Sequence, residues 1–356
     1  MHQKVKNMAK LYVFNPEHDL ALASNLSNFT APHAGRQLRA DLCYLPALWA
    51  GSDDYVLVEH VGQARRLYGR LRARVGGEPG RFIDKSQLSH LKVNKVEPWG
   101  WDLALRNALI RFGVSSDACA SETEIAVLRA CSHRRHTAEV LRRLDWEEPV
   151  EATTVEAVEL RLSKAPRLVV KAPWSSSGRG VRFIEGSLSD QNRGWVHHVI
   201  QQQGSIMLEP YYSKVKDFGM EFEALPDGEI RYLGLSLFDT RNGAYMGNII
   251  ASEEDKTNMI SQYVSVDLLY SVRAKVMDAL RDVIGGQYIG PFGVDMMIVA
   301  KSDGNGFLIH PCVEINLRRT MGHVALEMAK TSPVCLPRVM RITLTDKYRI
   351  QILRKR

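Results

Sequence analysis

The sequence has few cysteines, and they are spaced too widely to form a paired metal or redox motif. Its 356 residues include five cysteines, namely Cys43, Cys119, Cys131, Cys312 and Cys335. Their number is odd, and no two of them form a Cys-x-x-Cys pair. This pattern argues against a structural zinc site and favours a reducing compartment.

Long apolar runs and dense basic runs are absent as well. No run approaches the roughly 20 apolar residues of a membrane-spanning helix, and the charged segment 1–10 lacks the apolar core of a signal peptide. The net charge of +7 is spread along the chain, without the basic stripe and aromatic residues typical of nucleic-acid binding. We therefore expect a cytoplasmic protein that binds neither membranes nor nucleic acid, and whose charge favours small anionic ligands.

Three common signatures of nucleotide binding are also missing. The sequence has no Gly-x-x-x-x-Gly-Lys-Ser/Thr P-loop and no Rossmann dinucleotide fingerprint. A protein-kinase glycine loop would require a His-Arg-Asp catalytic loop and an Asp-Phe-Gly motif downstream, and neither occurs. The sequence therefore gives no support to these three classes of nucleotide site.

The first third of the chain has the pattern of an α/β unit. Strand-like runs at 11–14 and 55–59 alternate with helical patterns that start at Leu20 and near Gln63, which predicts a parallel sheet. An amphipathic helix at 101–112 closes this region, with Gly113 as its stop. We place an N-terminal α/β domain at residues 1–118.

The remainder, 119–356, changes from helices to strands. Helical patterns at 121–130 and 134–144 come first, with Ser121 and Glu124 spaced as a capping box. Strand-like runs then follow at 168–171, 181–185, 205–209, 217–224 and 230–239, before a helix at 267–284. This order predicts a small β-rich middle, about 150–215, and a final α+β portion.

The last two strand-like runs, 292–300 and 307–316, carry the most informative residues. Lys301–Gly306 is rich in turn residues and predicts a hairpin. If the turn centres on Gly304 and Asn305, Asp295 lies opposite Glu314, and Asn316 shares their face. Two facing carboxylates repel each other, whereas two carboxylates and an amide oxygen suit Mg²⁺. An edge hairpin with solvated acids, or a register slipped by one residue, stays open as the alternative.

A second informative segment is a Ser/Gly-rich loop between two strands. Leu168–Lys171 runs into Ala172–Gly180, and a strand-like run follows at 181–184. Small residues let backbone amides approach phosphate oxygens, and serine hydroxyls and Arg179 add donors. Lys171 would supply a fixed positive charge at the root of this flap. A plain surface turn is the alternative.

Together these motifs resemble the ATP-grasp superfamily over roughly residues 120–330. The resemblance implies an ATP-grasp fold at 119–356, with a small lid subdomain at about 150–215, preceded by a Rossmann-like α/β pre-ATP-grasp domain. Its catalytic candidates are Lys171, Arg179 and Arg318. Its metal ligands would be Asp295, Glu314 and Asn316.

The resemblance also implies an ATP site. Lys171 would bind phosphates under a flap that includes Ser175, Ser176, Ser177 and Gly178, and Met207–Tyr212 looks like the adenine hinge. There, Glu209 and the Pro210 carbonyl would face the adenine amino group and Tyr212 the ring, while Asp217 is placed like the acid that binds the ribose. Solvated strand-end acids are the alternative for Glu209 and Asp217.

Two positions depart from the family pattern. Arg134 stands roughly where many members carry a phosphate-binding lysine, and an arginine keeps the charge but changes the geometry. A solvated helix face explains it about as well. Gly293 replaces an arginine found in some ligases, so that role would fall to Arg318, Arg319 or Arg179.

Three further residues are candidates for binding the substrate. Arg241 would pair with a carboxylate and Asn248 would line the same acceptor pocket, although a hairpin turn around Asn242 is the alternative. His18 follows the carboxyl end of a strand, where open α/β sheets bind ligands, and helix capping is the alternative there. We interpret His310 and His323 as structural or surface residues, with the alternative that His323, which closely follows the metal strand, borders the active site.

The resemblance thus implies an ATP-grasp carbon-nitrogen ligase of the acid-amine or amino-acid type. ATP and Mg²⁺ (or Mn²⁺) would be its cofactors, and a small-molecule carboxylate and an amine its substrates, with a homodimer left open. Two alternatives remain, an ATP-dependent small-molecule kinase and a non-catalytic nucleotide-binding module.

Overall fold

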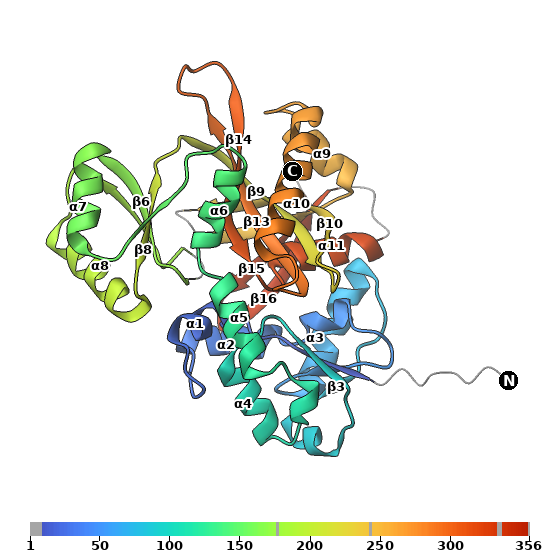
Figure 1. Cartoon of the computed structure of the whole chain (residues 1–356). Helices are drawn as coiled ribbons and strands as arrows, with labels where there is room; N and C mark the ends of the chain where they lie inside the picture. Colours follow the sequence, from blue (N-terminus) through green and yellow to red (C-terminus); the bar gives the residue numbers. More distant parts are fainter. Residues whose placement is uncertain (1–8, 176–177, 242–243, 333–336, 355–356) are drawn as a thin grey trace. The chain divides into compact units, whose positions relative to one another are not determined.

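The computed structural model describes residues 9–175, 178–241, 244–332 and 337–354 (Figure 1). The chain forms two compact units, which we call unit 1 (1–126 with 324–356) and unit 2 (127–323). The predicted boundaries, 1–118 and 119–356 with a lid at about 150–215, remain a prediction. Within the described ranges, no helix has the length and apolar character needed to span a membrane.

Unit 1 is built on the parallel sheet that the alternating pattern predicts. Its strand order is β3 (Phe82–Ile83), β2 (Tyr55–Leu57), β1 (Lys10–Val13) and β4 (Lys95–Pro98), and each neighbouring pair is parallel. Leu11 and Val96 are buried in its hydrophobic core. The chain after β1 leads to β2 and β3 on one side, and then crosses to β4 on the other.

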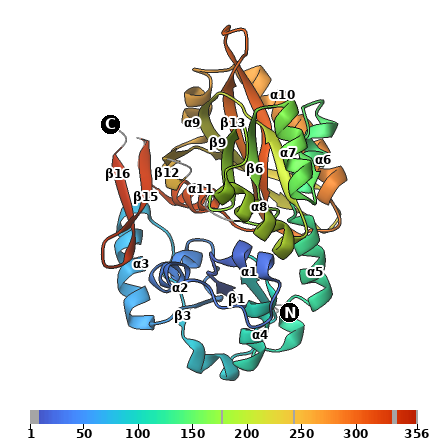
Figure 2. The ribbon, with the colours of Figure 1, turned by 90° about the vertical axis from the view of Figure 1, so that its left-hand side faces the viewer.

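The helices of unit 1 begin and end at residues with clear local causes. They are α1 (His18–Ser24), α2 (His33–Leu42), α3 (Val61–Val75), α4 (Leu103–Arg111) and α5 (Glu122–Cys131), the last continuing into unit 2 (Figure 2). The Asp102 carboxylate accepts a hydrogen bond from the Leu105 amide and starts α4. Gly113 has φ 93°, as a stop after α4 requires. The predicted capping box of Ser121 and Glu124 is confirmed by reciprocal hydrogen bonds.

The C-terminal residues add elements that the sequence analysis missed. Helix α11 (Met321–Thr331) runs from unit 2 into unit 1. Strands β15 (Arg338–Leu344) and β16 (Tyr348–Arg354) form an antiparallel hairpin, and the Tyr348 amide donates to Asp41 on α2 at 2.8 Å. Each strand carries two arginines among mainly apolar residues, and the sequence analysis assigned no strand beyond residue 316.

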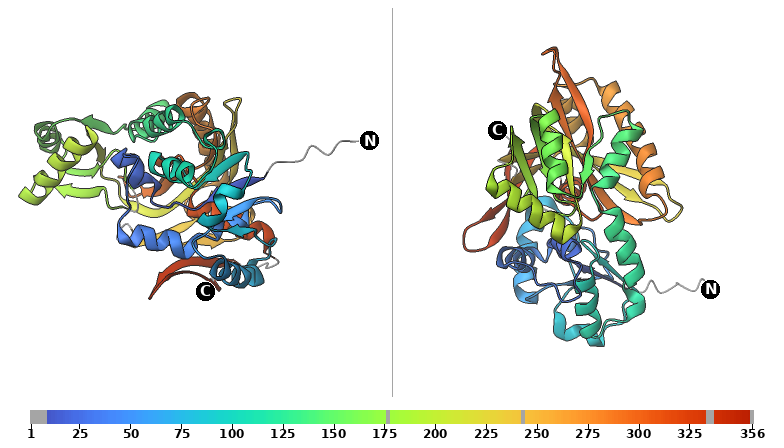
Figure 3. Two further views of the ribbon diagram at one scale, coloured as in Figure 1. Left: turned by 90° about the horizontal axis from the view of Figure 1, so that it is seen from below. Right: turned by 60° about the vertical axis from the view of Figure 1, so that its left-hand side comes forward.

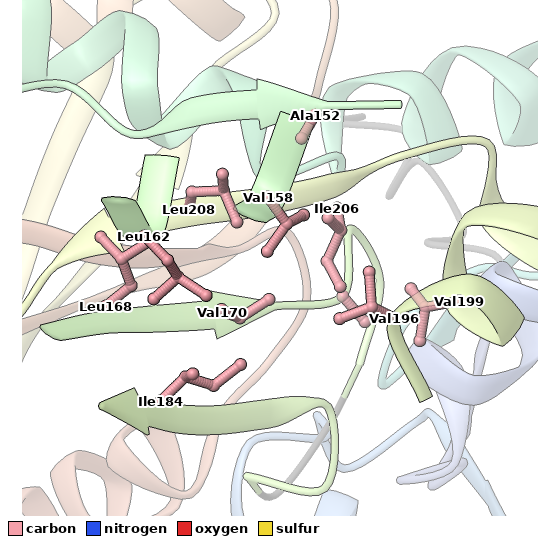
Figure 4. Close-up of a cluster of buried hydrophobic side chains, with 11 residues drawn as sticks. Ala152, Val158, Leu162, Leu168, Val170, Ile184, Val196, Val199, Ile206 and Leu208 are labelled. Atoms are coloured by element: carbon pink, nitrogen blue, oxygen red, sulfur yellow. The ribbon is translucent and has the colours of Figure 1, made fainter. Parts of the chain in front are cut away.

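Unit 2 contains a small antiparallel sheet with its own core. Its order is β5 (Val150–Ala152), β8 (Ile206–Pro210), β6 (Arg167–Lys171) and β7 (Val181–Glu185). Helices α7 (Val155–Lys164) and α8 (Asp190–Gln203) pack side by side on it (Figures 3 and 4). The expected β-rich middle therefore contains the helices α7 and α8 as well as strands. Thr154 and Ser189 cap these helices, a signal that the sequence analysis overlooked.

The main sheet of unit 2 is antiparallel. Its order is β10 (Ile230–Ser236), β9 (Lys214–Ala224), β13 (Gly290–Ala300) and β14 (Phe307–Asn316). Phe222 on β9 and Phe292 on β13 are fully buried and stack with their ring centroids 5.4 Å apart. Helices α6 (Arg135–Arg143) and α10 (Val266–Ile284) cover one face of this sheet (Figure 1). Helix α9 (Glu253–Ile260) and the hairpin of β11 (Phe238–Arg241) and β12 (Ala244–Ile250) complete the unit.

The hairpin of β13 and β14 has the predicted register where it matters. Asp295 pairs with Glu314, and Gly293 with Asn316. Nearer the turn, however, Ala300 pairs with Phe307. The turn therefore does not centre on Gly304 and Asn305, and this part of the prediction is wrong. A register shift between Asp295 and Met297 compensates for this difference.

The core of the small sheet gives a direct test of packing. Leu208 on β8 is 1% exposed and lies within the cluster of Figure 4. Replacing it by alanine removes buried methyl groups and leaves a cavity, which should lower the free energy of unfolding by about 2 to 5 kcal/mol. Leu160→Ala is the matched control, because Leu160 on α7 is 59% exposed and its loss should cost less than about 0.5 kcal/mol. Urea unfolding of both variants measures the difference, and equal losses would contradict the packing described.

Candidate active site

One buried arginine joins three segments of unit 2. Arg134, immediately before α6, donates from Nε to the Ala172 carbonyl at 2.9 Å and from Nη2 to Ser175 Oγ at 3.0 Å. The same Nη2 donates to Glu314 Oε1 at 2.7 Å. The side chain of Arg134 is 5% exposed, whereas that of its neighbour Arg135 is 57% exposed. A solvated helix face therefore describes Arg135, and Arg134 links the flap to β14.

The two facing carboxylates lie on a partly buried face of the main sheet. Asn316 Nδ2 donates to Asp295 Oδ2 at 3.3 Å, and Asn316 Oδ1 accepts from Arg318 Nη2 at 3.0 Å. Burial and the negative charges of Glu314 and Glu221 raise the pKa of Asp295 to about 7. Additional positive charge next to Asp295 would therefore be stabilising.

The donor set at these strands fits a hard divalent cation. Asp295, Glu314 and Asn316 offer carboxylate and amide oxygens on neighbouring rigid strands, as Mg²⁺ prefers. In the described part of the chain, no cluster of three or more His, Cys, Asp or Glu side chains is arranged to hold a metal ion. A cation here would therefore depend on the amide oxygen and on ligand phosphates as well as on the two carboxylates.

Lys171 and Glu209 form a second charged pair. Lys171 is the last residue of β6, and its Nζ lies 2.5 Å from Glu209 Oε2 on β8. It also donates to the Val313 carbonyl at 3.4 Å, one residue before Glu314. Both side chains are almost completely buried, so each charge is stabilised mainly by the other.

The predicted hinge carries an aromatic cluster that sequence reasoning missed. Beyond Pro210, the Tyr212 ring lies 4.9 Å from the His310 ring and 5.9 Å from that of Trp146, measured between centroids. Burial and the charge of Lys171 lower the pKa of His310 to about 3, so this imidazole is neutral at pH 7. The sequence analysis describes His310 only as a structural or surface residue. The three residues come from separate segments, and only the fold brings them together.

The flap is closed at its base by backbone hydrogen bonds. The Ala172 amide donates to the Gly180 carbonyl at 2.8 Å, and the Val181 amide to Gly178 at 3.3 Å. A Cβ on Gly180 would lie 2.3 Å from Ser175 Cβ, so only glycine fits at this position. Gly178 and Arg179 are exposed. The candidates Ser176 and Ser177 lie outside the described residues.

The remaining candidates are placed as follows. Asp217 on β9 accepts hydrogen bonds from Lys214 at 2.8 Å and from Thr240 at 2.5 Å. Asn248 is buried, and its amide group bonds to Ser236 and Tyr245. Arg241 is the last residue of β11, in the β11–β12 hairpin. A hairpin was the alternative to a substrate-binding role for this residue. The Arg241 side chain is not among the described parts of the structure. His18 belongs to unit 1, where it is buried against Gly100.

A buried acid beside the carboxylate pair also escaped sequence reasoning. Glu221 on β9 pairs in register with Gly293, and its Oε2 lies 2.9 Å from His323 Nδ1. A Cβ on Gly293 would meet both Glu221 Oε2 and Thr320 Cγ2 at 2.7 Å. Because Glu221 and Thr320 occupy this space, the arginine that some ligases carry at the position of Gly293 would have no room here. That Arg318, Arg319 or Arg179 takes over its role remains a prediction.

The arrangement of sheets has counterparts among solved structures. The chain is similar to N5-carboxyaminoimidazole synthetase from Staphylococcus aureus complexed with ADP, with a TM-score of 0.51, 12% identity, and coverage of 96% of this chain and 84% of that chain. It is similar to N5-carboxyaminoimidazole ribonucleotide synthetase from Thermus thermophilus, with a TM-score of 0.51, 13% identity, and the same coverage. The chain has the ATP-grasp fold.

A third ATP-grasp structure supports the same conclusion. Biotin carboxylase from Campylobacter jejuni, in a β-γ-ATP complex, matches with a TM-score of 0.50 and 10% identity, over 94% of this chain and 76% of that chain. No family model and no curated protein matches the sequence. At such low identities the likeness establishes the ATP-grasp fold alone, and confirms the predicted fold class.

The contacts of Arg134 lead to a stability prediction. Arg134→Ala leaves the buried Ala172 carbonyl and the Glu314 carboxylate without their shared donor, which should lower the free energy of unfolding by about 2 to 4 kcal/mol. Arg135→Ala removes only an exposed pair with Glu151 and should cost less than about 1 kcal/mol. Thermal and urea unfolding measure both. A loss for Arg134→Ala no larger than that for Arg135→Ala would show that Arg134 does not join these segments.

Proposed function

We propose that the protein is an ATP- and Mg²⁺-dependent carbon-nitrogen ligase, which activates a carboxylate as an acylphosphate for attack by an amine or a similar nucleophile. The observation that carries this proposal is the pairing of Asp295 with Glu314 on one face of the main sheet, beside Asn316, in a chain with the ATP-grasp fold. The similarity to an ADP complex supports a nucleotide ligand.

The proposal assigns the nucleotide to the space between the flap and the main sheet of unit 2. Lys171 and the flap residues Ser175 and Gly178 would bind the phosphates. Glu209, the Pro210 carbonyl and Tyr212 would bind the adenine, and Asp217 the ribose. The hydrogen bonds of Arg134 to Ser175 and Glu314 support this assignment, because they hold a positive charge between the flap and the acids.

Asp295, Glu314 and Asn316 would hold the metal, which neutralises charge on the phosphate oxygens when it is bound. A carboxylate oxygen of the substrate attacks the terminal phosphorus of ATP, and ADP leaves. The nucleophile then attacks the acyl carbon, phosphate leaves, and the amine loses its proton. Arg318, whose Nη2 lies 3.0 Å from Asn316 Oδ1, would stabilise the transferred charge, together with Arg179 of the flap. Catalysis would come from positioning and electrostatics, so no side-chain nucleophile is needed.

The test measures ADP and phosphate release in the presence of pooled amino acids, dipeptides and organic acids. Glu314→Gln should lower the turnover on the order of 100-fold, because a ligand charge used in the transition state is lost. Glu185→Gln is the matched control, because this acid on β7 is exposed, and it should keep full activity. Circular dichroism and thermal unfolding check that both variants fold.

The outcome also separates the proposal from its alternatives. A ligase releases phosphate and requires both a carboxylate and an amine. If ATP is consumed while the phosphate stays on the organic product, the protein is a kinase. If ATP binds without any turnover across the pools, a nucleotide-binding module is the better description. Turnover that Glu314→Gln leaves unchanged would contradict the assigned metal site.

A further inference from the structure

Unit 1 contains a cavity at the point where its strand order reverses. The chain leaves β1 for β2 and β3 on one side and returns to β4 on the other, and open α/β sheets bind ligands outside the carboxyl ends of two such strands. A cavity of about 330 Å³ lies there. We call it the switch-point cavity, and its polar lining includes Asn15, Glu17, Arg36, Asp102 and Arg111.

The buried part of the switch-point cavity is acidic, and its side chains are joined by hydrogen bonds. Asn15 Nδ2 donates to the Gly100 carbonyl at 2.7 Å and to Asp102 Oδ2 at 3.1 Å. Glu17 is 7% exposed, and its Oε1 accepts from Arg39 Nη1 at 2.5 Å. Capping of α4 accounts for Asp102, and the pair with Arg39 accounts for one oxygen of Glu17.

The second carboxylate oxygen of Glu17 has no such explanation. Within the described part of the chain, Glu17 Oε2 is buried without a hydrogen-bond partner. A buried acceptor that is left without a hydrogen-bond donor is destabilising. Burial raises the pKa of Glu17 despite Arg39, and burial, with a contribution from Glu17, raises that of Asp102 to about 6. A positively charged N–H donor bound in the cavity beside Glu17 would offset the repulsion between the Glu17 and Asp102 carboxylates.

The rim of the cavity has the opposite charge. Arg36 and Arg111 are exposed and line the cavity, and Phe29 and Leu105 add apolar side chains to its lining. A guanidinium group pairs well with a carboxylate. The switch-point cavity is thus lined by a buried carboxylate, that of Glu17, and by two exposed guanidinium groups, those of Arg36 and Arg111.

We propose that the switch-point cavity binds a small zwitterion with a free α-ammonium and a carboxylate, held by Glu17 and by Arg36 and Arg111 respectively. A free amino acid and a dipeptide share this chemistry. The proposal concerns unit 1 alone and is independent of ATP turnover by unit 2, so either can fail without the other.

The test is calorimetric titration of the full chain, without nucleotide, against pooled amino acids and, separately, pooled dipeptides. Binding from one pool identifies the source of the zwitterion. For the ligand resolved from that pool, the N-acetylated form and the methyl ester should each bind at least about tenfold more weakly, because one loses the ammonium and the other the carboxylate.

Variants locate the site. Glu17→Gln and Arg111→Ala should each weaken binding at least about tenfold, whereas the exposed controls Glu78→Gln and Arg66→Ala should leave it unchanged. Because Glu17 is buried, its variant is first checked by urea unfolding. Arg111 is exposed, so its variant keeps the test valid if Glu17→Gln does not fold. No binding from either pool, or binding that Arg111→Ala and N-acetylation leave unaltered, would overturn the proposal.

Discussion

The central constraint in unit 2 is electrostatic. Antiparallel pairing fixes Asp295 directly opposite Glu314, and Glu221 adds a third carboxylate to the same region, as its effect on the pKa of Asp295 shows. Like charges that face each other across a sheet are destabilising. The rigid strands cannot separate them, so positive charge must lie close by. Arg134 and Arg318 provide it through hydrogen bonds to Glu314 and Asn316.

Several other features follow from this need for positive charge. Arg134 reaches Glu314 because α6 packs beside β14, and its remaining donors bind the base of the flap at Ala172 and Ser175. The flap is therefore coupled to the acids through one side chain. Gly293 leaves room for the Glu221 carboxylate, which brings the third acid to this face. We propose that a metal ion and the phosphates of ATP complete the same charge balance during the reaction.

The sequence predicted much of the fold because its signals are local. Strand-helix alternation gave the parallel sheet of unit 1, the capping box at Ser121 was confirmed, and the hairpin placed Asp295 opposite Glu314. Part of what was missed depends on contacts between distant segments, and part on local signals that were overlooked. The cluster of Trp146, Tyr212 and His310 has no sequence signature. Helices α7 and α8 were missed although Thr154 and Ser189 cap them. The predicted pairing of Asp295 with Glu314 is correct although the predicted turn centre is wrong. A register shift that no sequence pattern reveals compensates for the difference.

The most direct test of the carboxylate pair as a metal site is crystallographic. Crystals grown with Mn²⁺ and a non-hydrolysable ATP analogue would give an anomalous difference map that locates the metal without assumptions about the ligands. We predict a manganese peak about 2 Å from oxygens of Asp295, Glu314 and Asn316, with the phosphates beneath the flap. A bound nucleotide whose manganese lies away from these three side chains would contradict the account.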